Sequence, residues 1–272
     1  MQKDFIMRAF IFVLSLIASP LAAHEFWLEP LDYQIADDGR LEAHIVNGQS
    51  FEGVKLSYLP QRFVRFEQFV GMRRMPVQGR LGSTPALNAP PLTLGLNVVI
   101  YQSTTATVNY ETWEKFQRFV DHKDFGDVRA LHDARDLPAD GFGEVYSRYA
   151  KTLINVGDGT GADLRTGLET EIVALTNPYT DDLSEGMRVQ VFYGDDVRID
   201  TQVEVFDKAP DDTVVITMVR TDAEGIAVVP VIAGHSYMLD AVVLREPSTE
   251  LAASSNAVWE TLWANLTFGV PE

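Results

Sequence analysis

The residues best suited to chemistry lie where an apolar leader meets the rest of the chain, in the stretch Leu21–Pro30 with the sequence LAAHEFWLEP. If the leader is removed after Ala23, the mature chain begins with His24. An N-terminal histidine offers a metal two nitrogen ligands, its α-amine and its ring Nδ1, whereas the backbone nitrogen of an internal histidine is an amide. Imidazole and amine nitrogens suit Cu(II) and Ni(II). His24 is therefore the first candidate metal ligand.

Further nitrogen ligands would come from the other four of the five histidines. We take His44 and His235 as the partners of His24 for a divalent transition metal, Ni, Co or Cu. The alternatives are a surface position for His44 and a turn role for His235. His122 ends a predicted helix, where a histidine ordinarily interacts with the helix dipole, and His132 is expected to be exposed. The sequence contains no HxH or HExxH motif, so it carries no zinc-enzyme signature.

A second group of polar and aromatic side chains lies in EVYSRYAKTLINVG, residues 144–157. Strand alternation places Lys151 on one face, and Tyr146 and Arg148 on the other. A buried Arg or Lys must be paired, and Glu144 is a nearby candidate partner. We expect a structural network of buried ion pairs here, and the alternative is a pocket for a ligand or a metal complex.

Composition and motifs argue against several classes of function. The chain has a net charge of −17, which repels the phosphates of nucleic acids. It contains no cysteine, which excludes thiolate metal sites and Cys nucleophiles. There is no GxSxG motif and no phosphate-binding glycine loop. We therefore expect a protein that is not an enzyme. The enzymatic alternative, a copper-brace oxidase similar in outline to polysaccharide monooxygenases, needs a second histidine close to His24.

Residues 1–23 have the features of a signal peptide. Lys3 and Arg8 precede an apolar run, Ala9–Ala18, and small residues precede the expected cut. The run is shorter than the about 20 residues that a membrane-spanning helix requires, and no other segment approaches that length. The sequence therefore predicts an exported protein of the periplasm, without a membrane span once the signal is removed.

Short alternating segments separated by turn residues predict a mainly β protein with two β-sandwich-like domains. The hydrophobic period changes in Glu111–His122, where four apolar residues recur at helical spacing. Gly126–Leu137 predicts a second short helix, and the Gly- and Pro-rich segment Gly79–Pro91 predicts a loop. We assign residues 24–180 to an N-terminal β-rich domain with a helical insertion near 111–137, and residues 185–272 to an Ig-like or transthyretin-like sandwich.

Five separated stretches resemble a family of exported bacterial proteins of unassigned function, earlier labelled a NikM-like component of a nickel-transport complex. The stretches are HEFWLEP, EVYSRYAKTL, GLETEIVALTNPY, TDAEG and WETLWANLTF. The resemblance implies a periplasmic all-β protein that ends in a domain similar to carboxypeptidase-regulatory or transthyretin-like modules. It also implies a link to the uptake of nickel, cobalt or another transition metal.

These observations lead to one expected function and one alternative. We expect a periplasmic, non-enzymatic accessory protein that binds a transition metal or its chelate and passes it to a membrane transporter or receptor. The alternative is a periplasmic interaction module that partners an outer-membrane receptor or transporter, with no role for a metal.

Overall fold

The structure, a computed structural model, describes residues 24–272, so the predicted signal peptide lies outside the described residues. Strands make up most of the secondary structure of this part, together with three α-helices and one short 3-10 helix. The predicted mainly β, sandwich-like class is confirmed. In residues 24–272, no helix has the length and apolar character needed to cross a membrane.

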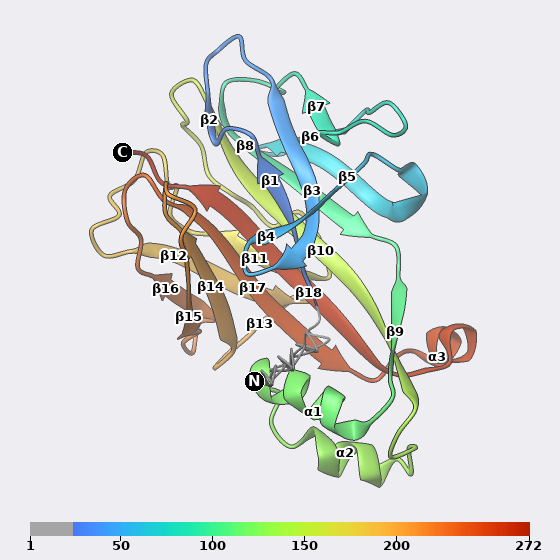
Figure 1. The fold of residues 1–272 in the computed structure, drawn as a ribbon. Helices are drawn as coiled ribbons and strands as arrows, with labels where there is room; N and C mark the ends of the chain where they lie inside the picture. The colour runs from blue at the N-terminus through green and yellow to red at the C-terminus, as the bar shows by residue number, and fades with distance from the viewer. Residues whose placement is uncertain (1–23) are drawn as a thin grey trace, which may run out of the picture.

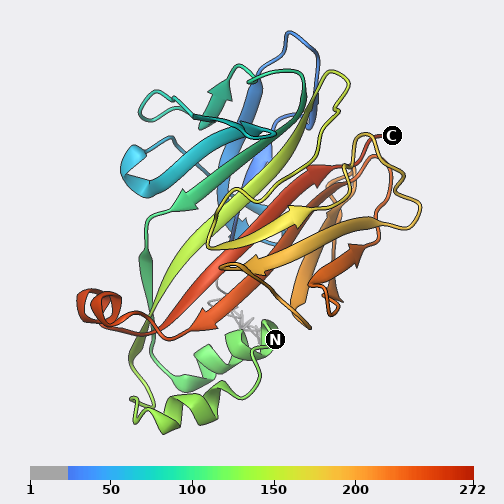
Figure 2. The same ribbon diagram turned by 180° about the vertical axis from the view of Figure 1, so that it is seen from behind.

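A ten-stranded sheet forms the middle of the molecule (Figures 1 and 2). Its main path runs through β15 (Val214–Arg220), β14 (Gln202–Lys208), β17 (Ser236–Arg245), β18 (Ala257–Gly269), β10 (Phe142–Val156), β8 (Gly95–Ser103), β5 (Phe63–Val70) and β6 (Arg73–Pro76), while β2 (Gln34–Ile35) and β9 (Ala106–Tyr110) pair with β10. β10 and β18 are parallel, and their register places Glu144 opposite Trp259 and Thr152 opposite Thr267. Strands from both sides of residues 180–185 thus share one sheet, and separate folding of the two predicted domains stays a prediction.

Two four-stranded sheets cover opposite faces of the large sheet. One contains β1 (Glu25–Pro30), β3 (Leu41–Gln49), β4 (Glu52–Leu56) and β7 (Leu87–Ala89), and the other contains β11 (Thr170–Ala174), β12 (Met187–Tyr193), β13 (Asp196–Val197) and β16 (Ile226–Val229). Alternation along β10 fills both interfaces, since Leu153 packs toward β11 and β12 while Ile154 packs toward β1 and β3. The prediction that Gly79–Pro91 is a loop is wrong in part, because this segment includes strand β7, which pairs with β3.

Helices α1 (Trp113–His122) and α2 (Val128–Ala134) cover the end of the sheet that the four-stranded sheets leave open (Figure 1). The short helix α3 (Thr249–Ser255) buries none of its residues, and η1 (Pro60–Arg62) precedes β5. The apolar stripe of α1 packs on Trp259 and Trp263 of β18, with Phe119 stacked 5.6 Å from Trp263. Both helices predicted within residues 111–137 are confirmed.

Candidate functional site

His24 is exposed and immediately precedes β1. The next residue, Glu25, is only 4% exposed, and Trp27 and Leu28 are fully buried. Buried side chains thus hold the start of β1 in place and leave the His24 imidazole at the surface. The α-amine, the second predicted nitrogen ligand, depends on cleavage after Ala23, which lies outside the described residues.

A cluster of buried charges lies beneath the start of β1. Lys123, the residue that follows α1, places its Nζ 2.5 Å from Glu204 Oε2 and 2.9 Å from Asp240 Oδ2. The two acids face each other across β14 and β17. His122 joins the cluster at its exposed side, with Nε2 3.1 Å from Glu204 Oε1. We call Glu25, His122, Lys123, Glu204 and Asp240 the acidic cluster.

Burial and mutual repulsion shift the pKa values of the acids in this cluster. Burial, with the negative charge of Asp240 as a second cause, raises the pKa of Glu25 to about 7. Burial also raises the pKa of Asp240, whose Oδ1 has no hydrogen-bond partner among the described residues. Burial opposes ionisation of Glu204 as well, but hydrogen bonds from His122 and Lys123 lower its pKa. Its hydrogen bond to Glu204 raises the pKa of His122. The cluster therefore favours bound protons or cations.

His44 lies at the far end of β1 from His24. The register pairs Glu25 with Gly48 and Glu29 with His44, and four residues of extended strand span about 13 Å. His24 and His44 therefore do not lie together.

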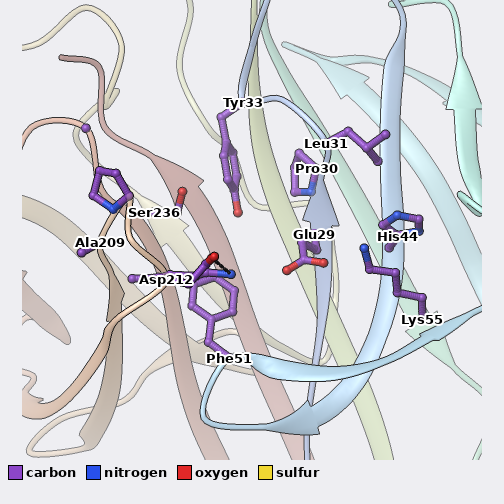
Figure 3. A pocket seen from close by; sticks show the side chains of 13 residues that line it. Glu29, Pro30, Leu31, Tyr33, His44, Phe51, Lys55, Ala209, Asp212 and Ser236 are labelled. Atoms are coloured by element: carbon purple, nitrogen blue, oxygen red, sulfur yellow. Dashed lines mark ion pairs between the residues drawn. The ribbon is translucent and has the colours of Figure 1, made fainter.

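His44 instead lines a pocket of about 450 Å³ between β1, β3 and β4 on one side and residues 208–212 and 234–236 on the other (Figure 3). Its Nδ1 is buried without a partner among the described residues, and burial and Lys55 lower its pKa. Neutral imidazole is the form that binds metals. The pocket also presents Glu29, whose carboxylate points into it, and the ion pair of Lys208 with Asp212 at 2.9 Å.

The predicted ligand His235 and the remaining histidine His132 both have local partners. His235 is half-buried, and its Nδ1 lies 2.7 Å from Asp207 Oδ1. The expectation that His132 is exposed is wrong: it is fully buried. Its Nε2 contacts the carbonyl oxygen of Pro138 at 2.8 Å, and its Nδ1 accepts a hydrogen bond from Trp259 Nε1. His132 is a core residue that joins α2 to β18.

The residues singled out in β10 divide between the two faces of the strand. Lys151 is 1% exposed and lies 2.7 Å from Glu171 Oε1 and 3.1 Å from Asp163 Oδ1. Glu144 and Arg148 lie on the opposite face, where Glu144 accepts hydrogen bonds from Tyr110 and Thr261. Glu144 is therefore not the partner of Lys151.

Arg148 and Tyr146 stay together on that second face. The Arg148 guanidinium lies 4.9 Å from the Tyr146 ring and 4.1 Å from the Trp263 ring. Tyr146 itself is half-buried. Burial raises the pKa of Glu144 to about 7, which reduces the negative charge available to Arg148. Arg148 thus meets aromatic faces rather than an ion-pair partner.

These positions do not amount to a prearranged metal centre. Within residues 24–272, no group of three or more His, Asp or Glu side chains is arranged to hold a metal ion. The donors that fit a transition metal are single imidazoles: His24 at the surface and His44 in its pocket. A metal at His24 would rely on the terminal amine for its second nitrogen.

Sequence reasoning missed Glu204 and Asp240 as neighbours of Glu25. They belong to strands far away in the chain, and only the order of strands in the large sheet brings them to β1. The available signal was a carboxylate between apolar neighbours in each of two strands, Glu204 in VEV and Asp240 in LDA.

Comparisons with known proteins place most of the chain in one family. The model described as "Domain of unknown function (DUF4198)" matches residues 21–245. A search of curated proteins finds no match. A solved structure described as "Crystal structure of tetra-tandem repeat in extending region of large adhesion protein" matches with 10% identity and a TM-score of 0.21, over 90% of this chain and 49% of the other. The chain thus spans about half the length of that matched chain.

Proposed function

Since this chain belongs to the family described as a domain of unknown function (DUF4198), we propose its function from the site: it is an exported, non-enzymatic protein that binds a transition metal or its chelate and passes it to an uptake system. Its compartment would be the periplasm. The likeness of five stretches to NikM-like proteins supports nickel or cobalt as the cargo.

The exposed His24 beside the acidic cluster carries this proposal. Cleavage after Ala23 would create an amine and an imidazole on one residue at the surface, next to the buried carboxyl of Glu25. Carboxylates nearby attract a divalent cation. Nitrogen donors select Ni(II), Co(II) and Cu(II) over Mg(II) and Ca(II). One anchoring residue at the surface suits a protein that must release its metal again.

Calorimetric titration with Ni(II), Co(II) and Cu(II) tests the terminal chelate. For this test the full chain is expressed with its leader, and the intact mass of the purified protein must show that it begins with His24. Three Ala residues added ahead of His24 convert its amine to an amide and move the new terminal amine away from the ring, so they should weaken affinity at least about tenfold, a loss of about 1.4 kcal/mol. Affinity should also fall at lower pH, because both nitrogens must lose their protons to bind the metal.

A matched control is His235→Ala, which removes one imidazole whose Nδ1 is already paired with Asp207. Its affinity should equal that of the parent protein. Equal affinity of the parent and the Ala-extended protein would contradict the proposal, as would an intact mass that places the cut at another bond.

A second function, an interaction module, is favoured by strand β15. This strand is at an edge of the ten-stranded sheet, where β14 is its one partner among residues 24–272. It exposes Val215 (54%), Ile216 (41%) and Met218 (45%). Natural proteins usually protect an apolar edge strand, because its free backbone groups pair with other chains. We propose under this alternative that a membrane receptor or transporter docks on β15.

Cross-linked capture from periplasmic extract separates the two functions. An interaction module should capture the same partner with and without a chelator, and Ile216→Lys should abolish the capture because the charge must be buried against the partner. Val228→Lys on β16, at a residue that is also exposed (47%), is the matched control. A partner that Ile216→Lys captures as well as the parent protein does would exclude docking on β15.

A further inference from the structure

Strand β10 lacks a sheet partner along part of one edge. β9 pairs with β10 as far as Tyr146, and β8 pairs with it from Leu153 onward. The rest of β8, residues 99–103, pairs with β5 and not with β10. The backbone N–H of Arg148, left without a sheet partner on this side, donates to Ser103 Oγ at 2.9 Å. The sheet is therefore open beside Arg148.

A cavity of about 530 Å³ occupies this opening. Its walls come from β1, β3, β4, η1, β8 and β10, together with the chain that joins β8 to β9. The apolar and aromatic part of the lining includes Phe26, Ile45, Leu56, Leu59, Tyr101 and Tyr146. Pockets for small organic molecules typically measure about 300–1,000 Å³ and are mostly apolar with a few polar groups. The cavity thus has the size and lining of a ligand site.

The charged part of the lining is entirely basic. Lys55, Arg62 and Arg148 line the cavity, and no described Asp or Glu does. This is unexpected in a chain with 39 acidic and 22 basic residues. Lys55 and Arg62 are exposed at the rim, whereas Arg148 is 7% exposed and forms part of the wall. The cavity therefore concentrates positive charge within an acidic protein.

Arg148 lacks the partners that a buried guanidinium requires. Its Nη1 has no hydrogen-bond partner among the described residues. Asp240, Glu144 and Glu25 lie within electrostatic range of it. However, the oxygens of Glu144 accept hydrogen bonds from Tyr110 and Thr261. A buried donor without an acceptor costs about 1–3 kcal/mol, so an anion that reaches the Arg148 guanidinium would remove an existing cost.

We infer that this cavity binds a small organic carboxylate with an aromatic or apolar body. The carboxylate lies against the Arg148 guanidinium, which presents paired N–H groups to a planar anion. Lys55 and Arg62 add charge at the entrance, and the body of the ligand packs on Phe26 and Tyr101, whose rings lie 5.1 Å apart. This site does not depend on a metal at His24.

Calorimetric titration with 2-naphthoate in the presence of a chelator tests the site, with 2-naphthamide as the uncharged analogue. The carboxylate should bind at least about tenfold more tightly than the amide, because each hydrogen bond to a charged group contributes about 1.5–3 kcal/mol. Arg148→Gln should reduce binding of 2-naphthoate by the same factor or more. Arg73→Gln, a change of an exposed arginine on β6, is the matched control and should leave it unchanged.

Thermal unfolding followed by circular dichroism must show that each variant is folded. If Arg148→Gln does not fold, the double variant Lys55→Gln with Arg62→Gln decides, since both side chains are exposed. It should weaken 2-naphthoate about tenfold and leave 2-naphthamide unchanged. Equal affinity for acid and amide, failure of 2-naphthoate to bind, or equal binding by the double variant and the parent protein would overturn the inference. None of these outcomes depends on metal binding at His24.

Discussion

At the scale of single residues, the clearest consequence of this fold is the burial of carboxyl groups. Glu25 and Glu144 are 4% and 1% exposed, and burial raises the pKa of each to about 7. Below the ordinary value of 4.5, each carboxyl is protonated whether the chain is folded or unfolded. Between pH 4.5 and about 7 the unfolded chain loses its protons while the folded protein keeps them. The free energy of unfolding therefore falls as pH rises through this range.

Glu144→Gln should reduce this pH dependence, because glutamine is uncharged at every pH. Urea denaturation at pH 5 and pH 8 gives the free energy of unfolding at each end of the range. The free energy of unfolding should fall less between pH 5 and pH 8 in the variant than in the parent protein. The difference should be on the order of 2 to 3 kcal/mol, which is the free energy that corresponds to the raised pKa of Glu144 over this range.

Glu111→Gln, a change of an exposed carboxylate in front of α1, is the control for that measurement. It should show the same fall as the parent protein. If the free energy of unfolding of Glu144→Gln falls between pH 5 and pH 8 as much as that of the parent protein, ionisation of Glu144 does not destabilise the folded protein.

Individual side chains are also where prediction from sequence was weakest. The exposure of His24 agrees with a role at the surface, but His132 is buried and His44 lies at the far end of β1. A histidine has the same local sequence signal whether it contacts solvent, a carboxylate or an aromatic ring. Its surroundings come from distant strands, which single-sequence patterns do not specify.

At the scale of elements, alternation along β10 was predictable and its partners were not. The pattern assigned Lys151 and Arg148 to opposite faces, which the packing of this strand confirms. It did not identify Asp163 and Glu171 as the acids around Lys151. They lie in a loop and in strand β11, which folds back over β10, so the pairing depends on how the sheets pack rather than on spacing.

Lys151→Met should destabilise the protein strongly, because it leaves Asp163 and Glu171 buried without a cation. Removal of one partner from a buried ion pair costs about 3–5 kcal/mol, and urea denaturation measures it. Lys115→Met is the matched control, since it removes a lysine whose partner Glu111 is exposed, and it should unfold close to the parent protein. A Lys151→Met variant as stable as the parent would show that the acids are neutral in the folded state.

Helix α1 was the element that sequence predicted best, since its apolar residues recur at helical spacing and all pack inward. Phe116 is fully buried against Tyr110, Phe142 and Trp259. Phe116→Ala should cost about 3–5 kcal/mol through the cavity it leaves. Leu131→Ala on α2, at a side chain that is 58% exposed, should change stability by less than about 0.5 kcal/mol. Equal effects of the two changes in urea denaturation would show that α1 does not contribute to the core.

At the scale of the whole molecule, the large sheet joins the two halves of the chain. The parallel pairing of β10 with β18 connects a strand near the middle of the sequence to the last strand. Parallel strands need a long connection, and here that connection contains all of β11 to β17. Repeated short strands were enough to predict a mainly β protein. They carry no information about which distant strands pair, because each buried strand has a similar apolar pattern.

This pairing predicts how the chain behaves when it is cut at the predicted boundary. Residues 24–180 and 185–272, made separately, would each expose one edge of the β10–β18 pair and part of a common core, with Tyr149 and Leu153 in one fragment and Leu262 and Leu266 in the other. Neither fragment should unfold cooperatively alone, and mixing them should restore the circular dichroism spectrum of the intact protein. A protease site inserted between the exposed residues Ser184 and Glu185 provides the control, since the halves should stay associated after cleavage. A fragment 185–272 that unfolds cooperatively alone would show instead that the C-terminal sandwich is an independent domain and that its pairing with β10 is a docking contact.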